Sequence, residues 1–103
     1  MTLRITLEEG SGSPTTLRVE GHLVTVGAAL LERECAGLLR AGSAVRLDLA
    51  GVSIVDRAGI AALERLERAG VEIRCRSGLV ASVLEGAGVR VKLDSDPADD
   101  GWQ

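Results

Sequence analysis

Aromatic residues are almost missing from the 103-residue sequence, which has one Trp, no Phe and no Tyr. Without them there are no platforms for stacking nucleic-acid bases and no aromatic cage for a cationic ligand. An excess of positive charge is also missing, since the formal net charge is −3 and the pI about 5.1. The basic residues are interleaved with acidic ones, so we expect no nucleic-acid partner, which would need a basic face.

Long hydrophobic runs are missing too. The longest uncharged stretches, such as residues 23–31, are too short to cross a bilayer. The first residues alternate between apolar and polar and lack the apolar stretch of a signal peptide. We therefore expect a cytoplasmic protein without direct membrane insertion. In that compartment Cys35 and Cys75 are expected to be reduced, buried thiols and not a disulfide.

Residues that commonly carry catalysis or bind metals are scarce. His22 is the single histidine, and the sequence has no Gly-x-Ser-x-Gly motif. His22, Cys35 and Cys75 are too dispersed for the paired spacing of a zinc site. A phosphate-binding P-loop is absent as well. The sequence therefore predicts no catalytic residue, no metal site and no cofactor, and we expect the protein not to be an enzyme.

A regular succession of strand and helix patterns is what the sequence does contain. Apolar residues recur at every second position in about residues 3–8, 17–24, 45–49 and 71–76. They follow a helical period in about residues 28–40, 57–68 and 79–86, and 89–93 is a candidate final strand. The order β-β-α-β-α-β-α-(β) predicts an α/β fold with a mixed sheet of four to five strands, because helical crossovers join parallel strands. The first two strands are expected to form an antiparallel hairpin.

Apolar stripes on the predicted helices indicate which side chains face the core. Leu30 belongs to the stripe of the first helix, together with Leu31 and Cys35. The stripe of the third helix comprises Leu79, Val80, Val83 and Leu84.

The two faces of the predicted sheet differ in polarity. Strands covered on both faces are nearly continuous apolar runs, whereas these strands are apolar at alternate positions only. The other positions carry Arg4, Thr6, Glu8, Arg18, Glu20, Arg46, Asp48, Glu72, Arg74 and Arg76. We therefore expect helices mainly on one face, and a solvated, charged opposite face with cross-strand ion pairs. Docking of another molecule on the charged face is the alternative.

The end of the chain has a different composition. Residues 94–103 contain four Asp, a Pro and Trp102. We expect residues 1–93 to form one domain and residues 94–103 a disordered acidic tail.

One segment, residues 52–60, has a pattern that suggests function. Asp56 lies between a predicted strand and a predicted helix, where its carboxylate is expected to accept from the amide of Ala58 or Gly59. Gly59 allows close packing of the helix start. Arg57 is unfavourable there, since a cation opposes the dipole at a helix N-terminus. A locally unfavourable exposed residue indicates either a functional use or simple tolerance.

Residues 47–63, LDLAGVSIVDRAGIAAL, resemble the signature of STAS domains, the sulfate-transporter and anti-sigma-factor-antagonist family. Residues 17–23, 71–74 and 83–89 show weaker likenesses to that family in the same order. The resemblance implies a STAS-like β-α superhelix and a non-enzymatic protein-binding role in bacterial signal transduction and transcription regulation. The partner-binding residues it implies are Ser53, Val55, Asp56, Arg57, Ala58 and Gly59.

The sequence departs from this family at one important position. In members that antagonise anti-sigma factors, a kinase phosphorylates the Ser or Thr directly after the motif Asp. Here Arg57 and Ala58 follow Asp56, and neither accepts a phosphate. A phosphate adds about −1.5 to −2 charges, whereas Arg57 is permanently positive. We therefore expect no phosphorylation at this turn.

Three functional hypotheses follow. The first is a protein-binding module that phosphorylation does not control. It is a monomer or weak dimer and binds an anti-sigma factor or a kinase-like regulator. The second is a soluble STAS subunit of a lipid-transporting ABC system, with a permease or ATPase as partner. The third is an enzyme or a small-ligand binder, with a nucleotide or lipid held at the start of the second helix, where free amides attract anions.

Overall fold

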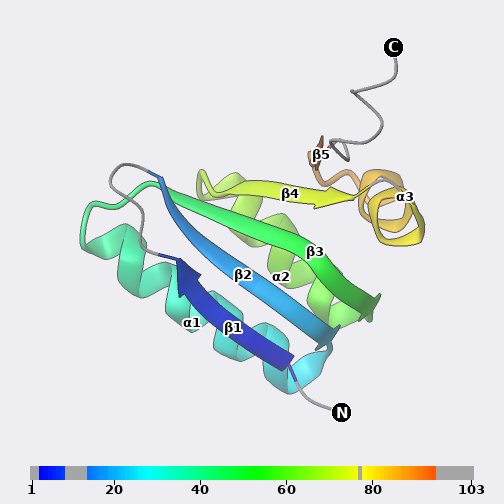
Figure 1. The fold of residues 1–103 in the computed structure, drawn as a ribbon, viewed down its shortest axis with the longest axis horizontal. Coiled ribbons are helices and arrows are strands. Elements are labelled where there is room, and N and C mark those ends of the chain that lie inside the picture. The colour runs from blue at the N-terminus through cyan, green and yellow to red at the C-terminus, as the bar shows by residue number, and fades with distance from the viewer. Residues whose placement is uncertain (1–2, 9–13, 77, 95–103) are drawn as a thin grey trace.

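The computed structural model describes residues 3–8, 14–76 and 78–94. Its strands and helices follow the predicted order (Figure 1). The strands are β1 (Leu3–Glu8), β2 (Thr15–Leu23), β3 (Val45–Val55), β4 (Glu72–Arg76) and β5 (Lys92–Asp94). The helices are α1 (Thr25–Arg40), α2 (Arg57–Arg68) and α3 (Leu79–Gly86).

The strands form a single five-stranded sheet in the order β1-β2-β3-β4-β5. β1 and β2 pair antiparallel, and the predicted hairpin is confirmed. The pairs β2–β3, β3–β4 and β4–β5 are parallel, because α1, α2 and α3 return the chain to the same end of the sheet. The predicted α/β fold with a mixed sheet is therefore confirmed.

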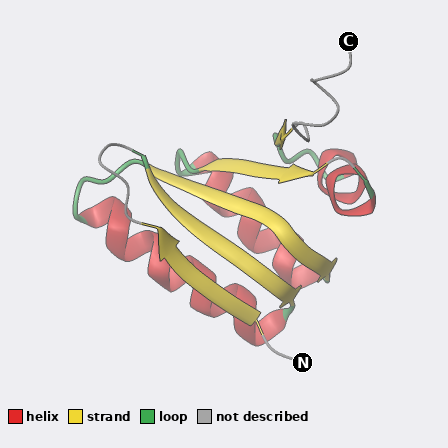
Figure 2. Cartoon of the chain, in the orientation of Figure 1, coloured by secondary structure: helices red, strands yellow, loops and turns green. Residues whose placement is uncertain are grey.

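The helices α1 and α2 lie side by side on one face of the sheet, while α3 lies near the end of β3 and β4 (Figure 2). Between these layers the core consists of Leu, Val, Ile, Ala and Cys side chains. Cys35 and Cys75 belong to this core as free thiols, as expected. Within the described part of the chain no polar or charged residue is buried.

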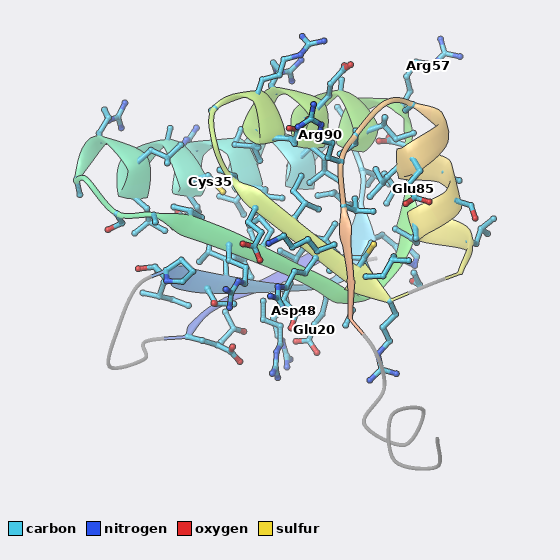
Figure 3. All side chains as sticks on the ribbon, turned by 90° about the horizontal axis from the view of Figure 1, so that it is seen from above. Glu20, Cys35, Asp48, Arg57, Glu85 and Arg90 are labelled. Carbon is cyan, nitrogen blue, oxygen red and sulfur yellow. The ribbon has the colours of Figure 1, made fainter. Side chains whose placement is uncertain are left out.

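The opposite face of the sheet is charged, as the alternation predicts. Figure 3 shows Glu20 and Asp48 on the side of the sheet away from α1 and α2. Ion pairs run across the strands: Arg18 lies 2.9 Å from Glu8, and Arg46 lies 3.0 Å from Glu72. The predicted cross-strand pairs are therefore confirmed.

Glu72 is the centre of a small network on this face. It accepts from Arg74 at 2.7 Å, and Lys92 lies 3.6 Å away. The hydrogen bond from Arg74, followed by the charges of Arg46 and Lys92, lowers the pKa of Glu72 against the opposing effect of burial.

Several element boundaries differ from the prediction. α1 begins at Thr25, three residues before the predicted start, because the amide of Ala28 already donates to Val24 O at 2.8 Å. β3 continues through Gly51 to Val55 without a break, although its pairing with β2 shifts register. The last strand covers Lys92–Asp94 instead of 89–93. The predicted tail lies almost entirely outside the described residues, and the domain boundary stays a prediction.

The predicted burial of α3 is wrong in part. Leu84 is buried, but Leu79 is 78% exposed and Val83 is 38% exposed. The reason is the position of α3 at the end of the sheet, where its main contacts in the described structure are with β3 and β4. One narrow strip of α3, with Ala81 and Leu84, is sufficient for that contact. Leu30 of α1 is likewise 43% exposed, and it lines an open groove together with Ile5 and Leu7 of the edge strand β1.

Candidate functional site

Asp56 joins β3 to α2, and its side chain caps that helix as predicted. Its Oδ1 accepts from the backbone amide of Gly59 at 2.8 Å. Its Oδ2 accepts from the backbone amide and the hydroxyl of Thr25, both at 3.3 Å. Thr25 is the first residue of α1, so a single carboxylate satisfies donors at the start of two helices.

Gly59 brings the first turn of α2 against the end of β2. A Cβ atom at this position would lie 2.4 Å from the carbonyl oxygen of Leu23 and 3.0 Å from Val55 Cγ1. The same carbonyl accepts from the backbone amide of Asp56 at 3.3 Å. Any larger residue would push α2 away from β2, and glycine therefore makes the close approach possible.

Arg57 is exposed and projects away from the body of the protein (Figure 3). It forms no ion pair with another residue that the structure describes. The first turn of α2 contains no acidic residue, whereas its last turn carries Arg65 and Arg68. The cation of Arg57 is therefore uncompensated within its own helix, as the sequence predicts.

An apolar groove lies beside this turn, between the end of β3 and α3. Its volume is about 150 Å³, and its lining residues are Ser53, Ile54, Val55, Leu79, Val80 and Val83. Ile54 is 48% exposed and Leu79 is 78% exposed, so apolar surface is open to solvent here.

The remaining predicted site residues lie around the same turn. Ser53 is exposed, with its hydroxyl 3.5 Å from Gly21 O. Val55 and Ala58 are half-buried. All six predicted residues are thus at one end of the sheet, and two of them, Ser53 and Val55, line the groove.

Four groove residues are not among the predicted site residues: Ile54, Leu79, Val80 and Val83. The helical period of the sequence instead predicts that the three residues of α3 face the core. A signal was present, because Leu79 with Val83 and Val80 with Leu84 form two adjacent apolar rows at i,i+4 spacing. A short helix at the end of a sheet buries one such row, and the other stays exposed.

Other kinds of site receive no support from the described residues. They contain no group of three His, Cys, Asp or Glu side chains that could hold a metal ion. His22 is a half-buried residue of β2 that pairs with Ile54 of β3. Of the three described helices, none is long and apolar enough to span a membrane.

The fold and this turn define the class of protein. The family model of the STAS domain matches residues 5–90, and the chain belongs to the STAS domain family. None of the curated proteins matches the sequence.

Solved structures share the fold at low sequence identity. An anti-sigma factor antagonist from Mycobacterium paratuberculosis is 18% identical, with a TM-score of 0.78 over 95% of this chain and 90% of that one. The anti-sigma factor antagonist SpoIIAA in its unphosphorylated form is 13% identical, with a TM-score of 0.67 over 94% of both chains. An uncharacterized protein with a SpoIIAA-like fold from Shewanella loihica is 15% identical, with a TM-score of 0.58 over 94% and 88%.

Proposed function

We propose that this protein is a non-enzymatic protein-interaction module of the anti-sigma-factor-antagonist type. It binds a protein partner through the end of the sheet where β3 leads into α2. The observation that carries the proposal is the exposed apolar groove of Ser53, Ile54, Val55, Leu79, Val80 and Val83, whose residue Val55 precedes the exposed cation Arg57 by two positions at the same turn. Apolar surface gathered beside a charged rim is characteristic of protein interfaces.

The chemistry of this surface indicates what the partner presents. An apolar side chain of the partner fills the groove, and an acidic side chain pairs with Arg57. Asp56 and Gly59 act differently, because their contacts are with Thr25 and Leu23 inside the protein. They hold the turn in place, while Ser53, Val55, Arg57 and Ala58 face the partner.

Arg57 also determines how the interaction is regulated. It follows Asp56, at the position where the resembling antagonists carry a phosphorylated Ser or Thr. A guanidinium has no hydroxyl to accept a phosphate and stays charged at every physiological pH. Regulation therefore acts on the partner or on the abundance of this protein, and not on this turn.

The partner class we propose is an anti-sigma factor or a kinase-like regulator. Two of the related structures are named anti-sigma factor antagonists, which favours this class over the subunits of a lipid transporter. Co-purification with a permease or an ATPase, and with no regulator, would instead support the transporter hypothesis.

The test begins with affinity purification from the native host and mass spectrometry of the retained proteins. The anti-sigma factors and kinase-like regulators of that host are then purified and titrated into the protein by calorimetry. We expect Arg57→Glu and Leu79→Asp each to weaken binding by roughly tenfold or more, since each lies in the proposed contact surface.

Arg40→Glu is the matched control. It makes the same charge change at an exposed position, 15 residues along α1 from Thr25 and therefore about 22 Å away. We expect its affinity to equal that of the wild type. Unchanged affinity in both Arg57→Glu and Leu79→Asp, with folding intact by circular dichroism, would refute the proposed surface.

A further inference from the structure

The edge strand β1 has one side without a strand partner in the described structure. β1 is the first strand of the sheet and pairs only with β2, so its other side presents free backbone amides and carbonyls (Figure 1). Its sequence alternates, with Arg4, Thr6 and Glu8 on the charged face and Leu3, Ile5 and Leu7 on the helix-covered face. Such an edge is able to accept one more antiparallel strand.

The charges on this edge complement a second copy of the same edge. In a two-fold antiparallel pairing with Thr6 opposite Thr6, Arg4 of each copy lies opposite Glu8 of the other. A shift of two residues in either direction places Thr6 opposite Arg4 or Glu8 and leaves the charges unpaired. Charged residues on an edge strand normally oppose pairing, but here the two-fold symmetry brings opposite charges together.

Contacts within one copy already hold Glu8 in position for the ion pairs of this dimer. Glu8 lies 2.9 Å from Arg18 of β2, and this ion pair holds its carboxylate on the charged face. Arg4 is exposed and has no ion pair with another residue in the described ranges. An Arg4 from a second copy would therefore give Glu8 a second cation.

The helix-covered face supplies the apolar half of the pairing. Leu7 is 46% exposed and Leu30 of α1 is 43% exposed. They line an open groove of about 310 Å³ together with Ile5, Leu17 and Glu34. In the register above, Ile5 of one copy lies opposite Leu7 of the other, so the two grooves meet and cover each other.

We propose that this edge binds a second copy of the protein, forming a homodimer with one continuous sheet across a two-fold axis at Thr6. The dimer is independent of the proposed partner surface, because β2 separates β1 from β3 in the sheet. One assembly would thus present two partner-binding turns.

A charge exchange tests the dimer. Sedimentation equilibrium over a range of concentrations measures the dissociation constant of the wild type and of the variants. We expect Arg4→Glu and Glu8→Arg to raise it roughly tenfold or more each, since each places like charges opposite one another. The double variant Arg4→Glu with Glu8→Arg restores the pairing in reverse and should dimerise more tightly than either single variant, although it loses the ion pair of Glu8 with Arg18 in each copy.

Arg90→Glu provides the matched control, because Arg90 is exposed and precedes β5, at the opposite edge of the sheet. Its dissociation constant should equal that of the wild type. A wild type that stays monomeric at every concentration would overturn the proposal. A double variant as weak as the single variants would also overturn it.

A disulfide test examines the register itself. In the proposed dimer the two Thr6 Cα atoms are about 4.5–5.5 Å apart, within the range that a disulfide bridges. Thr6→Cys should therefore give a covalent dimer under mild oxidation. Arg4→Cys should not, because its two copies are offset by about 13 Å along the strands. Equal cross-linking of both variants, or none of Thr6→Cys, would exclude this register.

Discussion

One carboxylate oxygen of Asp56 accepts from both the backbone amide and the hydroxyl of Thr25, a residue 31 positions earlier in the chain. The other oxygen caps α2 through Gly59. The first turns of α1 and α2 are thus tied to each other at the end of the sheet, beside the proposed partner surface. Because the Asp56 side chain is bonded to both helix starts, the turn between β3 and α2 is held rigid. A rigid turn binds a partner at a lower entropic cost.

Replacing Asp56 tests this link. We expect Asp56→Ala to lower the free energy of unfolding by about 1–2 kcal/mol, because it removes an N-cap as well as the contact with Thr25. Asp56→Asn keeps a side-chain oxygen for the Gly59 amide, and its free energy of unfolding should fall clearly less. Urea denaturation followed by circular dichroism measures both values. Equal stability of Asp56→Ala and the wild type would contradict the capping role.

Two glycines in helices should respond in opposite ways to the same substitution. Gly59→Ala places a Cβ atom 2.4 Å from Leu23 O, and we expect a loss of about 1–3 kcal/mol as α2 is displaced. Gly37 is exposed inside α1, and an added Cβ would meet nothing within 4 Å. Gly37→Ala should therefore stabilise the protein by about 0.5–1 kcal/mol through helix propensity.

Thermal unfolding monitored by circular dichroism compares these two variants with the wild type. A melting temperature that does not fall for Gly59→Ala would show that the contact with Leu23 has no special role, and one that falls for Gly37→Ala would contradict the expected gain from helix propensity.

The ion pair between α1 and α2 predicts a pH dependence. Arg65 donates two hydrogen bonds to Glu32, at 2.8 and 2.7 Å. This contact lowers the pKa of Glu32, with burial acting in the opposite direction. Because the pKa is lower in the folded state, the stabilisation is complete above the ordinary Glu pKa of about 4.3 and is lost as the pH falls through the folded value.

Glu32→Gln removes this ion pair and its titration. We expect the wild type to be more stable than this variant at neutral pH, and the difference to shrink as the pH falls below about 4.3. Glu85→Gln serves as a control, since Glu85 is exposed and forms no ion pair with the residues that the structure describes. A Glu32→Gln difference that does not change with pH would contradict the lowered pKa.

The buried thiols predict low reactivity. Burial, and secondarily the charges of Glu34 and Glu32, raises the pKa of Cys35 to about 12. Cys75 is 1% exposed. We expect a disulfide reagent to modify neither thiol in the native protein at pH values near 8, and to modify both after unfolding in urea. Rapid modification of the native protein would show that the core opens readily.

The order and type of the elements followed from patterns within short windows of the sequence. Alternation at every second position predicted β1 and the two-sided polarity of the sheet, and the 3.6-residue period predicted α2 from Arg57 to Arg68. The cap was also predictable, because Asp56 and Gly59 are only three residues apart. Each of these features depends on neighbours in the chain.

Other features depended on distant segments and could not be predicted from the sequence. The start of α1 was misplaced because Val24 caps it without a side-chain hydrogen bond, and no typical capping residue marks the position. The ion pairs of Glu72 depend on the register of β3, β4 and β5, which local alternation does not specify. The exposed row of α3 depends on where that helix meets the sheet.

By itself, the sequence determined the α/β architecture, the charged face of the sheet and the position of the Asp56 turn, since these arise from local periodicity and short-range hydrogen bonds. Only the tertiary structure decided that Thr25 shares the carboxylate of Asp56, that Leu23 leaves no room beside Gly59, and that Leu79 faces solvent beside Ile54. The physical reason is that each of these contacts joins segments far apart in the chain. Their meeting is set by strand pairing and by helix packing, and not by the residues next to them.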